Sequence, residues 1–165
     1  MPILLEESSI YSPYDVYLNQ ISGDRFKYNQ FHDKIKGLPE NLQDFVFGAE
    51  PADFIKNRIS EPLNLSETQT RETALVVMDL ILANIYLGNI VSEVQKRLGI
   101  DDQKAGTMAG LIVAELFGPI LEELKKEHIE KFAKNTPQQK FQNQNNAQNN
   151  QSSDDRTVDL KNSKF

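Results

Sequence analysis

The chain of 165 residues contains no cysteine. This absence excludes disulfide bonds, a thiolate nucleophile, and zinc or iron–sulfur centres that are held by cysteine. It is compatible with a reducing compartment. The first residues include neither a basic segment nor a long apolar run, so we expect no signal peptide and no membrane anchor. These absences together predict a cytoplasmic protein that does not associate with membranes.

The sequence also lacks the patterns that mark common classes of enzyme. It has no glycine-rich phosphate loop, no nucleophile elbow and no paired spacing of metal ligands. The two histidines, His32 and His128, lie far apart, and lysines flank His128 at helical spacing, so we predict that both are surface residues. We therefore expect no catalytic residue, no cofactor and no metal. An enzyme of an unrecognised type is the third hypothesis, which a polar pocket around Asp79 or His128 would support.

Positive charge is scarce in the part of the chain that is expected to fold. The formal net charge is -6, and residues 38–134 contain 10 Lys and Arg residues against 16 Asp and Glu residues. Such a segment lacks the basic field that drives most nucleic-acid binding. Nucleic acid is therefore an unfavoured partner, and the acidic charge is explained by solubility alone.

The most apolar stretch covers residues 74–87 and carries apolar side chains on nearly every face of a helix. This pattern predicts a helix that is buried on most sides. It is too short for a bilayer, which needs about 20 apolar residues. A capping box of Ser66 and Gln69 begins the helix, and Gly88 is expected to end it.

Two polar side chains interrupt this stretch and are candidate buried polar groups. Asp79 falls on a row that faces solvent as a narrow strip, or else it is buried and paired with a basic side chain. Asn84 is expected to bond a neighbouring backbone group rather than a ligand. Whether Asp79 is exposed to water decides between its two interpretations.

Capping residues, prolines and apolar spacing predict shorter helices around this central one. Pro62 is expected to stop one of them, and Gly118-Pro119 to kink the last one. The expected helices cover residues 10–21, 25–36, 39–47, 52–59, 89–98, 103–117 and 120–132. The sequence thus predicts an all-α fold, an orthogonal bundle of about five helices over residues 38–134 with a helical N-terminal arm over residues 1–37.

The N-terminal arm contains four of the five tyrosines. Aromatic side chains at this density dock either on the fold itself or on a partner. The sequence leaves both possibilities open. The candidate partner-binding residues are Tyr11, Tyr14, Tyr17, Phe26, Tyr28 and Phe31.

Residues 135–165 form a tail of a different composition. Residues 138–151 include eleven Gln and Asn residues among fourteen. This tract cannot bury enough apolar area to offset its ordering entropy, so we predict a disordered tail. It serves as a linker, or as a site of self-association through amide ladders.

Residues 92–117 have the layout of a helix-turn-helix motif, with a glycine in the turn and alanines in the second helix. The positions that would read bases are Gln103, Lys104, Gly106, Thr107 and Gly110. Lys96, Arg97 and Lys104 supply little positive charge for phosphate contacts. The alternative interpretation is that the small residues let this helix pack closely against the central helix.

Several segments together resemble a known domain. They are LPENLQDFVFG, PADFIKNRI, the central helix ending in LG, VQKRLGI, and AGLIVAELFGPILEEL. This pattern over about residues 38–124 is similar to a small helical domain of uncharacterised proteins from candidate-phylum, Patescibacteria-type bacteria. The resemblance implies an all-helical domain and no functional residues, because this family has no established activity.

We therefore expect a non-enzymatic module for protein–protein interaction or self-association. Its contact surface is expected to be the aromatic arm or the kinked last helix. A helix-turn-helix protein that binds nucleic acid through residues 92–117 is the alternative.

Overall fold

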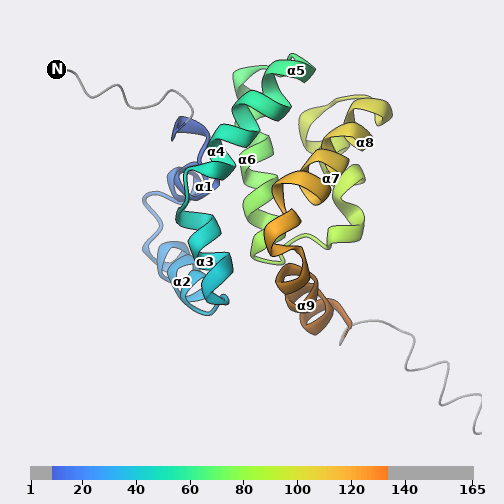
Figure 1. Ribbon diagram of the computed structural model, residues 1–165. Coiled ribbons are helices and arrows are strands. Elements are labelled where there is room, and N and C mark those ends of the chain that lie inside the picture. The colour runs from blue at the N-terminus through green and yellow to red at the C-terminus, as the bar shows by residue number, and fades with distance from the viewer. Residues whose placement is uncertain (1–8, 134–165) are drawn as a thin grey trace, which may run out of the picture. The chain divides into compact units, whose positions relative to one another are not determined.

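The computed structural model describes residues 9–133 of the chain (Figure 1). Over these residues about 82% of the chain is helical and no strand is present, which confirms the predicted all-α fold. The predicted Gln/Asn-rich tail lies outside the described residues. The described residues up to Glu130 belong to one compact unit, so the N-terminal arm shares a unit with the central helix.

The helical elements follow one another with short connections. The α-helices are α1 (Pro13–Gln20), α2 (Arg25–Lys36), α3 (Glu40–Phe47), α4 (Glu50–Phe54), α5 (Glu61–Leu63), α6 (Glu67–Ile81), α7 (Ile90–Leu98), α8 (Asp102–Gly110) and α9 (Leu121–Phe132). The 3-10 helices are η1 (Ser9–Tyr11), η3 (Leu87–Asn89) and η5 (Gly118–Ile120). Two π-helical segments, η2 (Ile55–Ser60) and η4 (Leu111–Leu116), continue α4 and α8.

Capping residues begin or end several of the helices. The capping box of Ser66 and Gln69 is formed at the start of α6. The Asp101 side chain accepts a hydrogen bond from the Lys104 N–H group at the start of α8. Gly99 ends α7 with φ 63°, the left-handed conformation that glycine adopts without strain. The predicted capping box is therefore confirmed, and all three caps depend on residues only a few positions apart.

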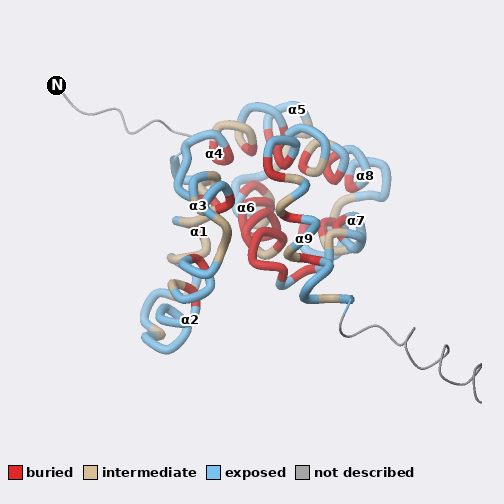
Figure 2. Tube along the Cα trace, turned by 60° about the horizontal axis from the view of Figure 1, so that its bottom comes forward, coloured by how far each residue is buried: buried red, intermediate tan, exposed pale blue. Residues whose placement is uncertain are grey.

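The central helix α6 is buried along most of its length (Figure 2). It ends at Ile81, however, and not near Gly88 as predicted. Ala83 adopts φ 53°, and the Asn84 N–H group donates to the Asp79 carbonyl at 2.8 Å. This is a helix-ending motif with an alanine at the left-handed position where glycine is usual, so the sequence carried no signal for it.

The two predicted proline interruptions differ in outcome. Gly118-Pro119 breaks the last helix, and its two parts, Asp102–Leu116 and Gly118–Phe132, are bent by 59°. Pro62 does not stop its helix, which continues to Leu63 and ends at Asn64 with φ 51°. The preceding residues form a π-helical turn, in which the Glu61 N–H group bonds the Lys56 carbonyl, and this wider turn accommodates the proline.

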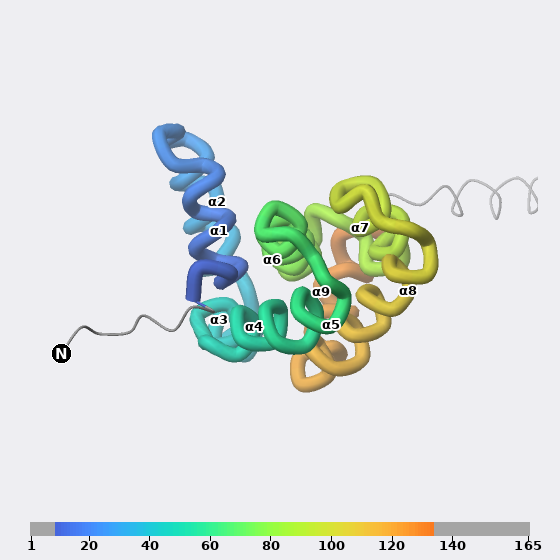
Figure 3. Tube along the Cα trace, turned by 90° about the horizontal axis from the view of Figure 1, so that it is seen from above, coloured from blue at the N-terminus to red at the C-terminus, as the bar shows by residue number. Residues whose placement is uncertain are grey.

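Helices α1 and α7 both pack against α6, and α7 also packs against α8. Helices α1 and α2 form a hairpin beside α6 (Figure 3), and Val16, Phe31 and Ile35 join the core. The predicted close-packing face of α8 is only partly correct. Ala105 and Ala109 are buried, whereas Gly106, Gly110 and Ala114 face open space or solvent.

Within residues 9–133, no single helix combines the length and the apolar composition that crossing a membrane requires. One bent pair, Asp102–Leu116 with Gly118–Phe132, meets the requirement jointly.

Candidate interaction surface

His128 is buried in the fold, and the prediction that it lies on the surface is wrong. It is 2% exposed. Its Nδ1 accepts a hydrogen bond from the Leu87 N–H group at 3.1 Å, and its Nε2 lies 2.7 Å from the Leu80 carbonyl. Because a carbonyl only accepts, Nε2 carries the proton, and the neutral ring satisfies both neighbours.

A sequence signal for the burial of His128 exists. Ile120, Leu124 and His128 follow one another at intervals of four, and all three are buried. This spacing places them on one face of α9. Ile129, the residue after His128, is by contrast 64% exposed. The lysines that flank His128 suggested a solvated histidine, although this apolar spacing indicates a buried one.

A pocket of about 350 Å³ lies between η3 and α9, and we call it the η3–α9 pocket. Its lining is mostly apolar, and two of its lining side chains, Tyr86 (47% exposed) and Ile129 (64% exposed), are among the large apolar groups that the fold leaves exposed. The residues that line it are Tyr86, Leu87, Gly88, Val113, Lys125, His128 and Ile129.

One wall of the pocket depends on Gly88. A Cβ atom at this position would lie 2.6 Å from Cε1 of Tyr86, so any larger residue forces the tyrosine ring to move. The ring of Tyr86 also lies with its centroid 6.3 Å from that of His128. Gly88 and His128 together therefore fix this wall, His128 through its bond to Leu87.

The rim of the pocket carries a lysine. Lys125 Nζ lies 3.4 Å from Oε1 of Glu122 one turn earlier on α9. The side chains of this pair are 50% and 84% exposed, so the pair contributes little to stability. Burial, followed by repulsion from Glu130 and Glu123, raises the pKa of Glu127, which shows that carboxylates gather elsewhere on α9.

Asp79 is the centre of a polar network, which settles its two interpretations in favour of a paired carboxylate. Its side chain is 13% exposed and lies 2.8 Å from Nη1 of Arg97. Asn84 donates to Oδ1 of Asp79 at 3.0 Å and accepts from Lys34 at 3.2 Å. Arg97 also pairs with Glu93 at 3.4 Å. The network thus joins α2, the end of α6, and α7.

The predictions for Asn84 are wrong in two respects. The residue is exposed rather than buried, and its side chain bonds Asp79 and Lys34 rather than a backbone group. The early end of α6 explains both errors, since Asn84 lies in the loop after the helix and not on one of its faces. Tyr17 also bonds Asn84, while burial, followed by the charge of Asp79, raises the pKa of its phenol.

The aromatic residues of the arm do not form one exposed surface. Phe31 is 3% exposed and packs against Tyr14 and Tyr17, with ring centroids 5.6 Å and 4.7 Å away. These two tyrosines are half-buried. Phe26 is 71% exposed and Tyr28 43% exposed. Tyr11 is also half-buried against the core, so the fold itself holds four of the six candidate partner-binding residues.

His32 is half-buried rather than a plain surface residue. Its ring lies with its centroid 4.5 Å from that of Tyr28. Its Nε2 atom is buried and has no hydrogen-bond partner among the described residues. The two histidines thus differ in their hydrogen bonding, because only His128 has both ring nitrogens hydrogen-bonded to backbone groups.

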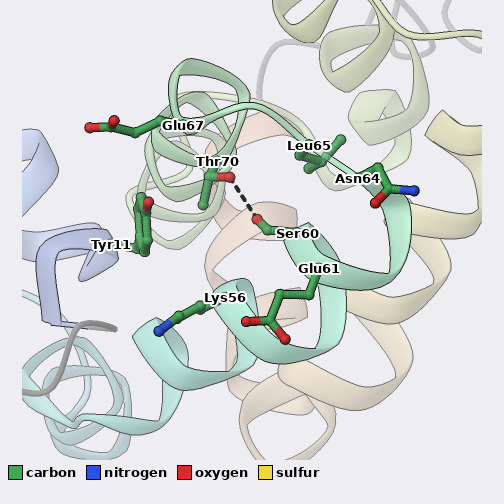
Figure 4. A pocket seen from close by; sticks show the side chains of 8 residues that line it. All are labelled: Tyr11, Lys56, Ser60, Glu61, Asn64, Leu65, Glu67 and Thr70. Atoms are coloured by element: carbon green, nitrogen blue, oxygen red, sulfur yellow. Dashed lines mark hydrogen bonds between the residues drawn. The ribbon is translucent and has the colours of Figure 1, made fainter.

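A second, more polar pocket of about 390 Å³ lies beside the start of α6 (Figure 4). Tyr11 contributes one wall, and Ser60 donates a hydrogen bond to Thr70 at 2.8 Å inside it. Thr70 in turn donates to the Ser66 carbonyl at 2.8 Å, so these hydroxyl groups tie η2 to α6. Its lining includes neither Asp79 nor His128, around which a polar pocket would support the third hypothesis, an enzyme.

The proposed base-reading positions of the helix-turn-helix interpretation all lie on the exposed face of α8. A three-residue turn that contains Gly99 joins α7 to α8. Arg97, one of the few basic side chains nearby, is engaged by Asp79 and Glu93. Within residues 9–133 no group of three or more His, Asp or Glu side chains is arranged to hold a metal ion.

Comparisons with protein-family models, with curated proteins and with solved structures gave no match to this chain.

Proposed function

We propose that this protein is a non-enzymatic protein–protein interaction module whose contact surface is the η3–α9 pocket. The observation that carries the proposal is an apolar pocket flanked by two exposed apolar side chains, Tyr86 and Ile129. Interfaces draw most of their affinity from a few large side chains that fill such pockets. The occupant in this proposal is a large apolar side chain of a partner protein.

The wall of the pocket is held in place before any partner binds. His128 bonds Leu87, and the Tyr86 ring rests against Gly88. A site that is already ordered loses less conformational entropy on binding. This ordering supports a binding role over a merely solvent-exposed apolar patch.

The aromatic arm is a weaker contact surface than the pocket. Phe31 is buried, and Tyr14 and Tyr17 are occupied by packing inside the fold. The two strongly exposed aromatics of α2, Phe26 and Tyr28, are two positions apart, which places them about 200° apart around the helix axis. They therefore cannot contribute to one patch on the same helix face.

Two matched double variants test the proposal. Tyr86→Ser with Ile129→Ser removes the apolar rim of the pocket, and Phe26→Ser with Tyr28→Ser removes the exposed aromatics of α2. All four residues are exposed, so both proteins are expected to fold. In affinity purification from the native host, we expect the pocket variant alone to lose partners that the wild-type protein recovers. Recovery of every partner by the pocket variant would refute the proposal.

A nucleic-acid-binding function through α7 and α8 is the alternative. It is supported by the exposed positions of Gln103, Lys104 and Thr107 on α8, after a turn of suitable length. The engagement of Arg97 by two carboxylates weighs against it. A mobility-shift assay at low salt decides: binding of duplex DNA that Lys104→Glu abolishes would favour this alternative over the pocket.

A further inference from the structure

We infer that the partner segment combines a large apolar side chain with a nearby carboxylate, which Lys125 recognises. This inference rests on the proposed function of the η3–α9 pocket and adds the chemistry of its occupant. Among the described residues that line the pocket, Lys125 is the one with a formal charge, since the Nδ1 atom of His128 accepts a hydrogen bond and the ring is therefore neutral.

The size of the pocket suits a side chain. Pockets that enclose a whole small-molecule ligand measure about 300–1,000 Å³. The η3–α9 pocket, at about 350 Å³, lies at the lower end of this range, and Tyr86, Lys125 and Ile129 in its lining are exposed. An apolar side chain that enters it leaves its own backbone outside, where neighbouring residues of the partner reach the rim.

The positive charge of Lys125 at the rim favours a negative charge on those neighbouring residues of the partner. The bond between Lys125 and Glu122 spans 3.4 Å, and the glutamate is 84% exposed. Such an exposed pair is weak, so a partner carboxylate can displace Glu122 at little cost. When the partner covers the pocket it also excludes water, which strengthens the attraction to the Lys125 ammonium group.

The opposite preference would follow from net charge alone. The chain has a formal net charge of -6 and attracts cations in general. A preference of the pocket for an anion therefore has to come from a local positive group. A preference for an anion would therefore distinguish recognition by Lys125 from the non-specific attraction of the whole chain for cations.

The neighbouring residue on α9 provides a matched control. Lys126 Nζ lies 3.3 Å from Glu123 with the same spacing of three residues, but Lys126 does not line the pocket. Lys125→Gln and Lys126→Gln change the net charge equally, and each breaks an ion pair of similar length and spacing. Any difference between the two variants in binding then reports on the pocket.

The experiment uses three probes with the same apolar chain: octanoate, octanol and octylammonium. Each is titrated at millimolar concentration into the full-length 15N-labelled protein, and the amide signals of Leu87, Gly88 and Ile129 are followed by NMR. We expect all three probes to shift these signals, with octanoate binding about fivefold more tightly than octylammonium. Lys125→Gln is expected to abolish this preference, and Lys126→Gln to retain it.

The outcomes separate the inference from the proposed function. If none of the probes shifts the pocket signals, the proposed function fails and the inference fails with it. If all probes bind but octanoate has no advantage, or Lys126→Gln abolishes the advantage as well, the inference alone is wrong. If octanoate binds with micromolar affinity, the occupant of the pocket is a small apolar acid and not a partner protein. Gly88→Ala, which displaces the Tyr86 ring, is expected to weaken all three probes alike.

Discussion

The substitution His128→Leu tests whether this buried histidine holds the pocket wall in place. Leucine is an apolar residue of roughly similar volume, so the change removes the two hydrogen bonds and leaves little empty space. The Leu80 carbonyl keeps a partner, because it also accepts from the Ala83 N–H group at 3.1 Å. The Leu87 N–H group loses the acceptor that His128 Nδ1 supplies at 3.1 Å.

The expected magnitude follows from these two losses. A buried donor that loses its partner costs about 1–3 kcal/mol, and the loss of a bond to a carbonyl that keeps another partner costs about 0.5–1.5 kcal/mol. Burial of the more apolar leucine side chain offsets about 1 kcal/mol. We therefore expect the free energy of unfolding to fall by about 2 kcal/mol, or the melting temperature by about 8 °C.

Urea denaturation followed by circular dichroism measures this loss, and the second histidine supplies the control. His32→Leu removes a buried nitrogen that has no partner among the described residues, so we expect it to change stability by less than about 0.5 kcal/mol or to raise it. If His128→Leu unfolds at the wild-type urea midpoint, or if both variants are equally destabilised, the assigned role of His128 is wrong.

Three further predictions concern the network and the core. Asp79→Asn and Arg97→Gln are each expected to lower the free energy of unfolding by about 1–2 kcal/mol. A double-mutant cycle by urea denaturation should give a coupling energy of about 1 kcal/mol between them, and simple additivity would contradict their pairing. The raised pKa of Tyr17 gives stability that is present below pH 10 and lost as pH rises through the folded pKa; absorbance titration against Tyr17→Phe checks this shift. Phe117→Ala should cost about 3–5 kcal/mol, whereas Phe26→Ala at 71% exposure should change stability by under about 0.5 kcal/mol.

The fold could be predicted from the sequence wherever the deciding signal was local. The capping box at Ser66, the left-handed cap at Gly99 and the interruption at Gly118-Pro119 each involve residues a few positions apart. Apolar spacing likewise identified α6 as the buried centre of the fold. Backbone chemistry and periodicity act over one or two helical turns, which is the range that such patterns describe.

The errors arose where the backbone adopts a conformation that local sequence preference does not indicate. Ala83 takes a left-handed conformation that a sequence pattern assigns to glycine or asparagine, so the end of α6 was placed too late. Pro62 was expected to stop its helix, but a preceding π-helical turn accommodates it. Ala83 is buried, so packing around it stabilises its conformation, whereas Pro62 is exposed and depends on the backbone turn that precedes it.

The candidate site was predicted less well than the fold. The kinked last helix was named as a possible contact surface, but its pocket also needs Tyr86 and Gly88 from a loop more than thirty positions earlier in the sequence. The role of His128 depends on its hydrogen bonds with Leu80 and Leu87, which lie far from it in the sequence. A periodic pattern within one helix cannot predict contacts between residues so far apart in the sequence.

Photo-crosslinking in the native host tests the central claim most directly. Benzoylphenylalanine replaces Ile129 at the pocket in one strain and Phe26 on α2 in another, and mass spectrometry identifies the crosslinked peptides. The account predicts that position 129 captures one partner sequence, at a segment that combines a large apolar residue with Asp or Glu, and that adding Gly88→Ala reduces the yield. Specific adducts from position 26 together with none from position 129 would contradict it.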